Sequence, residues 1–272
     1  MKKILITGAT GFIGSRLYQA ISKYNPIGIT RQDISQKSDV FIKCDLTDQT
    51  SVNKIISTIQ PDVIFHFAAM ISPQKNEENP EESRMMNFGV TENIINAIDL
   101  ESTHIIFLST DKVFDGSDLS PDEMVKTNPL WFYGLQKYEC EKLIQRNLIK
   151  HHIIRLPIVH GNGKEDSSSF IDEALINLSK GNAVHSFDNI KRCYVKVDEL
   201  IRFLKNLIGD TNYGIYHAGS AMISYYKRIL MLCIENDIDI KEGLIAVEGK
   251  ANPKLQNMNT QKLQQIYNYS FT

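Results

Sequence analysis

The sequence predicts an α/β fold built on a doubly wound parallel sheet. Two observations support this: apolar, strand-like runs alternate with amphipathic helical segments through most of the chain, and a glycine-rich turn directly follows the first apolar run. Such alternation is typical of parallel strands joined by right-handed crossovers, with helices on both faces. The strands are near-continuous apolar runs, such as Val63-Ile64-Phe65, as expected for strands covered on both sides. We therefore predict a Rossmann-type domain with a smaller C-terminal substrate-binding lobe.

The order of elements sets the expected domain boundaries. Strands are expected at residues 3–7, 27–30, 40–43, 63–67, 104–109 and 152–155. Helices are expected at residues 12–23, 49–58, 81–99, 132–149, 168–180, 198–208 and 224–235. After Leu156 the pattern loosens into loop-like stretches. We expect a dinucleotide-binding domain at 1–157, to which 186–218 return through a strand at 214–217, and a smaller lobe made of 158–185 and 219–272.

The glycine-rich turn, Thr-Gly-Ala-Thr-Gly-Phe-Ile-Gly at residues 7–14, predicts a phosphate site. Gly8 allows the sharp turn out of the strand, Gly11 lets a pyrophosphate approach the backbone, and Gly14 lets the helix pack closely. Free N–H groups at the start of that helix then face the anion. Cofactor contacts are therefore expected from these three glycines and from Thr10, Phe12 and Ile13.

Composition excludes several functional classes. The chain has 272 residues, 42% hydrophobic and 23% charged, with a formal net charge of −2, so nothing indicates nucleic-acid binding. No apolar run is long enough to span a membrane, and the first one is too short for an export signal. The four cysteines are widely spaced and form no metal or redox motif. We expect reduced thiols, no metal site and a cytoplasmic protein.

A tyrosine and a lysine four residues apart suggest proton-transfer chemistry. Tyr133 and Lys137 would lie on one helical face, and an ammonium beside a phenol lowers the phenol pKa. Such a tyrosine can exchange a proton with a carbonyl or alcohol oxygen, which the Thr110 hydroxyl could also hold. By itself this spacing is common in amphipathic helices. Downstream of a glycine-rich turn it favours hydride transfer involving a nicotinamide, with Lys137 reaching a ribose hydroxyl.

These motifs resemble those of extended short-chain dehydrogenases/reductases, and in particular the dTDP-4-dehydrorhamnose reductase group. The matching pieces are residues 7–14, 44–48, 61–69, 109–116, 133–137, 155–157 and 252–254. The resemblance implies that Thr110, Tyr133 and Lys137 are catalytic and that Asp111 touches the sugar. Two positions depart from the group, which often has an aromatic residue at Lys112 and usually an arginine at Asn252.

The resemblance also implies which residues surround the cofactor. Asp45 would hydrogen-bond the adenine amine, although a local helix cap is the alternative. Leu46 and the small residues Ala68 and Ala69 would lie against the dinucleotide, whereas His66 is expected to be packed in its strand.

The residues at the end of the second strand are expected to determine whether the cofactor carries a 2′-phosphate, that is, whether it is NADPH or NADH. Arg31 suits a 2′-phosphate and favours NADPH. A solvated surface arginine is the alternative, and Asp33 could serve NADH instead.

Two further residues are weaker candidates for substrate contacts. His160 follows a strand near the expected cleft, and Arg192 could meet a nucleotide diphosphate. The alternatives are a structural histidine and a surface charge.

Three functions stay open. The first is an NADPH-dependent reductase of a nucleotide-linked 4-keto-6-deoxy sugar, of the kind that, by resemblance, supplies dTDP-rhamnose and other polysaccharide precursors. The second is an NAD-dependent epimerase or dehydratase; Lys112 stands where dehydratases have a glutamate, which counts against dehydration. The third is a non-catalytic, NADP-binding regulatory subunit, because the regulatory subunit of methionine adenosyltransferase resembles the same group. A homodimer is also possible.

Overall fold

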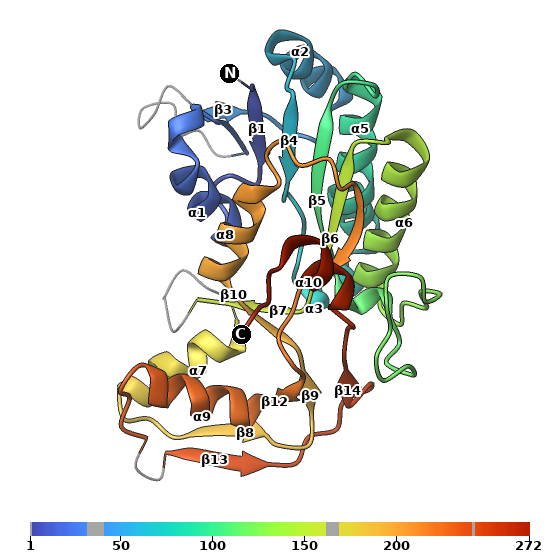
Figure 1. The fold of residues 1–272 in the computed structure, drawn as a ribbon. Coiled ribbons are helices and arrows are strands. Elements are labelled where there is room, and N and C mark those ends of the chain that lie inside the picture. The colour runs from blue at the N-terminus through green and yellow to red at the C-terminus, as the bar shows by residue number, and fades with distance from the viewer. Residues whose placement is uncertain (1, 32–40, 162–168, 241–242) are drawn as a thin grey trace. The chain divides into compact units, whose positions relative to one another are not determined.

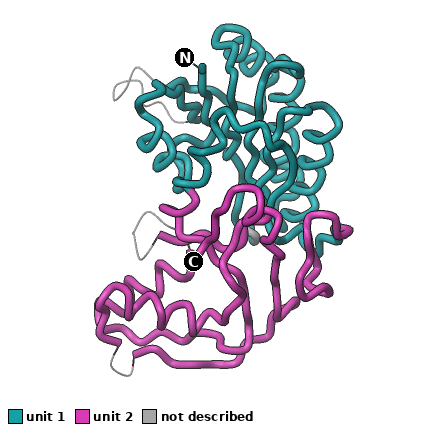
Figure 2. The backbone as a smooth tube through the Cα atoms, viewed as in Figure 1, with its two compact units in different colours: residues 1–113, 127–155, 201–216 teal, residues 114–126, 156–200, 217–272 magenta. Residues whose placement is uncertain are grey.

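The computed structural model describes residues 2–31, 41–161, 169–240 and 243–272. The chain divides into two compact units (Figure 2): unit 1 comprises 1–113, 127–155 and 201–216, and unit 2 comprises 114–126, 156–200 and 217–272. Among the described residues, no helix is both long and apolar enough to cross a membrane.

Unit 1 is the predicted Rossmann-type α/β domain (Figure 1). Its seven-stranded sheet has the order β11-β6-β5-β4-β1-β2-β3. The strands are β1 Ile4–Thr7, β2 Ile27–Thr30, β3 Phe41–Lys43, β4 Val63–His66, β5 His104–Thr110, β6 His151–Leu156 and β11 Gly214–His217. Parallel pairing joins β3 to β2, β2 to β1, β1 to β4 and β4 to β5. The carboxyl ends of these strands therefore meet at one edge, where ligands bind in open α/β sheets.

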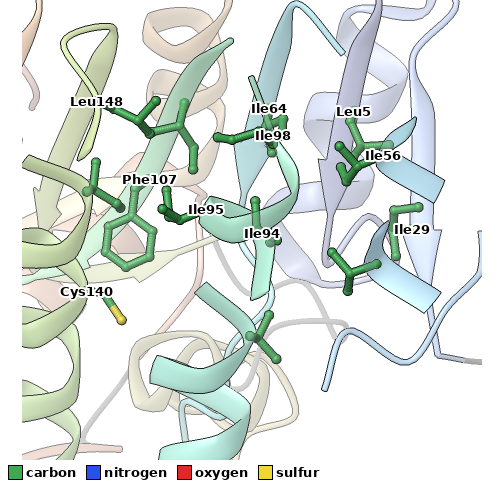
Figure 3. Close-up of a cluster of buried hydrophobic side chains, with 14 of the residues drawn as sticks. Leu5, Ile29, Ile56, Ile64, Ile94, Ile95, Ile98, Phe107, Cys140 and Leu148 are labelled. Atoms are coloured by element: carbon green, nitrogen blue, oxygen red, sulfur yellow. The ribbon is translucent and has the colours of Figure 1, made fainter. Parts of the chain in front are cut away.

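Helices cover this sheet and complete its core. They are α1 Phe12–Ala20, η1 Ser22–Tyr24, α2 Gln49–Ile59, α3 Pro73–Glu78, α4 Pro80–Arg84, η2 Met85–Gly89, α5 Val90–Ala97, η3 Asp111–Val113, α6 Phe132–Asn147 and α8 Val197–Asn206. Strand residues such as Leu5, Ile64 and Phe107 pack against α2, α5 and α6 on one face (Figure 3). The strand residues between them are buried as well, which explains the continuous apolar runs.

The helix predicted at 81–99 is instead three consecutive helical segments. Between α4 and α5 the chain forms the π-helical turn η2. Asn87 in this turn exchanges hydrogen bonds with the backbone of Met70, at 2.7 Å from Met70 N to Asn87 Oδ1 and 3.3 Å from Asn87 Nδ2 to Met70 O. A π-helical turn re-aims one side chain without ending the helix, and such turns are frequent at functional sites.

Unit 2 contains β7 Ile158–His160, β8 Val184–Phe187, β9 Lys191–Arg192, β10 Tyr194–Lys196, β12 Ile223–Ser224, β13 Leu244–Val247 and β14 Leu255–Gln256, with helices α7 Phe170–Ser179, α9 Tyr225–Glu235 and α10 Gln261–Tyr267. Its boundaries differ from the expected ones. Residues 186–200 belong here because β8 pairs with β13, while β9 pairs with β12 and β14. These paired strands are far apart in the sequence, so no local sequence pattern could have predicted which strands pair.

Two buried histidines in unit 1 predict acid sensitivity. His104 Nε2 lies 2.7 Å from His152 Nδ1, and burial lowers the pKa of His104 to about 3 and that of His152 to about 4, from 6.5. Below pH 6.5 both histidines therefore become protonated in the unfolded chain but stay neutral in the folded chain. The free energy of unfolding falls as the pH drops toward 4. We expect each histidine to cost about 2 kcal/mol of unfolding free energy at pH 5 relative to pH 7.

Urea unfolding at both pH values measures this loss. In His152→Gln the difference between pH 7 and pH 5 should shrink by about 2 kcal/mol. The exposed control His185→Gln should leave the difference unchanged. If the free energy of unfolding depended on pH equally in wild type and His152→Gln, His152 would not be a source of the acid sensitivity.

Candidate active site

The glycine-rich turn has the close contacts that its sequence predicts. Gly8 has a φ of +65°, and a Cβ there would lie 2.9 Å from the backbone nitrogen of Ala68. A Cβ on Gly14 would lie 2.1 Å from the carbonyl oxygen of Gly8. The turn closes through a hydrogen bond of 3.0 Å from Gly11 N to Gly8 O. Gly8 and Gly14 are therefore required by the fold itself.

Gly11 differs, because the fold leaves space beside it. Within the part of the chain that the structure describes, and apart from its chain neighbours, a Cβ on Gly11 would meet only the Gly8 oxygen, at 3.2 Å. Gly11 is also the N-cap of α1, and no side chain accepts a hydrogen bond from the helix start among the described residues. Open space beside uncapped N–H groups fits a dinucleotide pyrophosphate. Thr10 is exposed and Phe12 and Ile13 are half-buried at this helix start.

A chain of hydrogen bonds holds the loop after β4 against the end of β1. Thr7 Oγ1 accepts from the backbone nitrogens of Phe67 at 3.1 Å and Ala68 at 3.2 Å, and lies 2.8 Å from His66 Nδ1. His66 Nε2 lies 3.0 Å from Thr91 Oγ1, and burial lowers the pKa of His66 to about 3. A neutral His66 that accepts from Thr7 and donates to Thr91 satisfies the whole chain. This packed histidine fixes the backbone before Ala69.

The two residues predicted at the adenosine end lie near each other. Arg31 is exposed and donates to Met86 Sδ at 3.7 Å. The pKa of Asp45 is lowered, first by hydrogen bonds from Thr47 and further by the charge of Arg31. The structure therefore places a guanidinium and a carboxylate beside the ends of β2 and β3. Asp33, the alternative ribose partner, lies outside the described residues.

Asp45 is not the cap of α2. That role belongs to Asp48, whose carboxylate accepts from Thr50 N and Ser51 N, each at 3.1 Å. Asp45 Oδ1 instead accepts from Thr47 N at 3.0 Å and Thr47 Oγ1 at 2.7 Å. The carbonyl of Leu46 accepts from Asn93 at 2.9 Å, which anchors this loop to α5. Contact with adenine stays a prediction for Asp45 and Leu46.

The proposed catalytic residues come from the end of β5 and the first turns of α6. Thr110 ends β5, and its hydroxyl lies 3.3 Å from Asp111 Oδ1. Helix α6 packs directly on the following turn, since a Cβ on Gly134 would lie 2.2 Å from the carbonyl oxygen of Lys112. This close approach buries the Tyr133 hydroxyl near Asp111, and burial followed by the Asp111 charge raises the tyrosine pKa. Thr110 and Asp111 are buried, and Tyr133 is half-buried.

The electrostatics of this site differ from the expected pattern. We expected Lys137 to lower the pKa of Tyr133, but burial and the Asp111 carboxylate raise it. The Lys137 ammonium lies 4.0 Å from the centre of the Phe107 ring. Burial lowers the pKa of Lys137 to about 8. Because its pKa is raised, Tyr133 is a protonated phenol at neutral pH, and nothing among the described residues lowers its pKa toward that pH.

Sequence reasoning missed Glu141, Ser109 and the buried amides beside the catalytic helix. Gln136 Oε1 accepts from Ser83 at 2.9 Å and from Asn87 at 2.7 Å, next to Lys137 in sequence. Glu141 is buried one turn after Lys137 and accepts from Ser109 at 2.5 Å. Its spacing from Lys137 repeats that of Lys137 from Tyr133, a signal that was present in the sequence.

The two weaker substrate candidates, His160 and Arg192, lie in unit 2 with protein partners. His160 is fully buried, and its Nε2 lies 2.8 Å from the NH2 atom of Arg228. Arg192 donates to the carbonyls of Pro253 and Lys254, at 2.9 Å each. These contacts support structural roles, and substrate binding stays a prediction for both.

The sequence is similar to a known protein family and to several of its characterised members. Residues 1–256 match the family model described as the RmlD substrate binding domain. Bovine methionine adenosyltransferase 2 subunit beta is 32% identical over 235 residues, covering 83% of this chain and 70% of that protein. The zebrafish form is 28% identical over 207 residues, covering 76% of this chain and 63% of that protein.

Bacterial relatives show the same likeness. The dTDP-4-dehydrorhamnose reductase of Salmonella typhimurium is 30% identical over 171 residues, covering 62% of this chain and 55% of that protein. The Bacillus anthracis dTDP-4-dehydrorhamnose reductase, solved with NADP, has a TM-score of 0.85 at 20% identity, covering 99% of this chain and 94% of that one, and confirms the fold. The chain therefore belongs to the RmlD substrate binding domain family of extended short-chain dehydrogenases/reductases.

Proposed function

We propose that the protein is an NADPH-dependent reductase of a nucleotide-linked 4-keto-6-deoxy sugar, as in dTDP-4-dehydrorhamnose reductases. The observation that carries this proposal is the intact set Thr110, Tyr133 and Lys137 on β5 and α6, in a chain whose glycine-rich turn fits a dinucleotide. NADPH, when bound, supplies a hydride to the carbonyl carbon. The product would serve polysaccharide synthesis in the cytoplasm.

Each residue has a distinct role in this reaction. Tyr133 donates its phenolic proton to the sugar carbonyl oxygen, which thereby becomes the alcohol, and Thr110 donates a hydrogen bond to the same oxygen. Lys137 binds a ribose hydroxyl and so orients the nicotinamide. Neither the Tyr133 hydroxyl nor the Lys137 ammonium has a hydrogen-bond partner among the described residues, so both are available for these contacts. Asp111 is proposed to contact the sugar.

A panel of nucleotide-linked keto sugars, monitored for loss of NADPH absorbance, tests this function. Stoichiometric NADPH consumption with a 4-keto-6-deoxy sugar is the expected result. Conversion of a sugar nucleotide without net consumption would indicate an epimerase instead.

A regulatory role is the second candidate, favoured by the methionine adenosyltransferase subunits among the relatives. In that case the chain would bind NADP and a synthetase partner without turning over any sugar nucleotide. Co-purification with a synthetase, combined with no activity across the panel, would support this role over the reductase.

Arg31 is expected to decide the preference between NADPH and NADH. Wild type should bind NADPH more tightly, and Arg31→Ala should lose roughly 1.5–3 kcal/mol of that preference, because a charged hydrogen bond to the 2′-phosphate is lost. NADH has no such phosphate, so its affinity should barely change. The loss should shrink at high salt, since exposed charges are screened.

Fluorescence titrations with both dinucleotides measure this preference. Lys54→Ala removes an equal charge from the exposed side of α2 and should leave it intact. Equal losses of affinity for NADPH and NADH in Arg31→Ala would contradict the contact of Arg31 with the 2′-phosphate. A wild type that prefers NADH would contradict it as well.

A further inference from the structure

A buried ion pair lies directly behind the proposed catalytic residues. The Arg155 guanidinium on β6 donates two hydrogen bonds to the Glu141 carboxylate in a bidentate arrangement, at 3.0 Å from Nε to Oε1 and 2.7 Å from NH2 to Oε2. The two side chains are 3% and 1% exposed. Replacing such a pair by apolar residues is often neutral or stabilising, so stability alone does not account for it.

The pair connects the elements that carry the proposed catalytic residues. Glu141 lies one helical turn after Lys137 and two after Tyr133 on α6. The same carboxylate accepts a hydrogen bond of 2.5 Å from Ser109, the residue before Thr110 on β5. One buried carboxylate therefore holds β5, β6 and α6 together where the reaction would take place.

The charge of Glu141 also acts on Lys137. None of the ion pairs among the described residues includes Lys137, whose ammonium rests on the Phe107 ring. Burial disfavours the ammonium and lowers its pKa, whereas the neighbouring Cys140 and Glu141 side chains on α6 act in the opposite direction. The titratable groups around Lys137 and Tyr133 are His66 on β4, Asp111 on η3, and Cys140 and Glu141 on α6.

We propose that Glu141 is a positioning residue for Lys137: clamped by Arg155 and Ser109, it fixes α6 against β5 and supplies the negative charge that keeps the Lys137 ammonium protonated. A protonated, oriented ammonium offers three N–H donors to a ribose hydroxyl, and its charge strengthens the hydrogen bond. This inference rests on the proposed function for its catalytic meaning. Its physical core, the coupling of Glu141 to Lys137, does not depend on any substrate.

The test is the titration of Lys137 followed by the 13Cε shift in protein labelled with [13C]lysine, assigned with Lys137→Met. Glu141→Gln keeps the side-chain shape but removes the charge, so the Lys137 midpoint should fall by roughly one pH unit. Glu139→Gln on the same helix removes a charge that is 32% exposed and paired with Arg84, and should leave the midpoint in place.

The direction of the shift separates positioning from mere support of the fold. If Glu141 only stabilised the fold, its loss would loosen α6, expose Lys137 and raise the midpoint toward 10.5. A raised or unchanged midpoint in Glu141→Gln would therefore overturn the proposal. Should that variant not fold, Glu141→Gln/Arg155→Gln leaves no unpaired buried charge. A smaller fall of the Lys137 midpoint is expected of it, because removal of the Arg155 charge offsets part of the loss of the carboxylate, and a raised or unchanged midpoint there would likewise overturn the proposal.

Turnover gives a second readout wherever a substrate is found. The alkaline limb of the kcat profile should move with the Lys137 midpoint in Glu141→Gln and stay in place in Glu139→Gln. A limb that does not move with the midpoint would overturn the catalytic part of the proposal. If no sugar nucleotide reacts, the proposed function fails, while the titration still decides whether Glu141 controls the charge of Lys137.

Discussion

Tyr133→Phe is expected to lower turnover of the keto sugar by at least about 100-fold, the lower end of what general acid catalysis contributes. The substitution removes only the hydroxyl that donates the proton, on a helix whose first turn is fixed by Gly134 against Lys112. NADPH affinity should change little, because the glycine-rich turn and Lys137 remain. Steady-state kinetics and a fluorescence titration measure the two quantities separately.

Tyr138→Phe is the matched control for this prediction. It removes one hydroxyl from the same helix, at a half-buried position where the ring contacts the Lys142 ammonium, 5.3 Å from its centre. Its turnover should stay close to wild type. Near-normal turnover in Tyr133→Phe, or an equal loss in both variants, would remove Tyr133 from the mechanism.

Gly11→Val is expected to abolish dinucleotide binding while the protein stays folded. Gly11 has φ −79° and ψ 175°, which valine readily adopts, and among the described residues beyond its chain neighbours a Cβ there would approach only the Gly8 oxygen. The fold therefore tolerates a side chain there, whereas the pyrophosphate does not, because the side chain would occupy the space it needs beside the backbone amides. No saturable NADPH binding is expected at concentrations that saturate wild type.

Gly14→Ala separates the two uses of glycine in this turn. Its Cβ would lie 2.1 Å from the Gly8 backbone oxygen, so the turn itself must distort and the melting temperature should drop clearly. Gly11→Val should melt near wild type, as followed by circular dichroism. Unchanged cofactor affinity in Gly11→Val would show that the turn has only a structural role.

The proposed catalytic residues could be read from the sequence because their signals are local. Tyr133 and Lys137 lie one helical turn apart, and Thr110 ends an apolar run, so spacing and position were enough to nominate them. Their electrostatics were not predictable. The pKa of Tyr133 is raised first by burial and then by the charge of Asp111, and both follow from the packing of α6 on the chain at Lys112.

By itself, the sequence determined the order of the sheet strands and of most of the helices in unit 1 and the turn at Gly8, and it nominated the proposed catalytic residues. Each follows from a periodicity or a steric requirement within a few residues. Only the tertiary structure decided that 186–200 pair within unit 2, that His66 bridges Thr7 and Thr91, and that Glu141 lies between Ser109 and Arg155. These contacts join residues from different helices and strands. The hydrophobic pattern of the sequence predicts which residues are buried, but it does not predict which residues they contact.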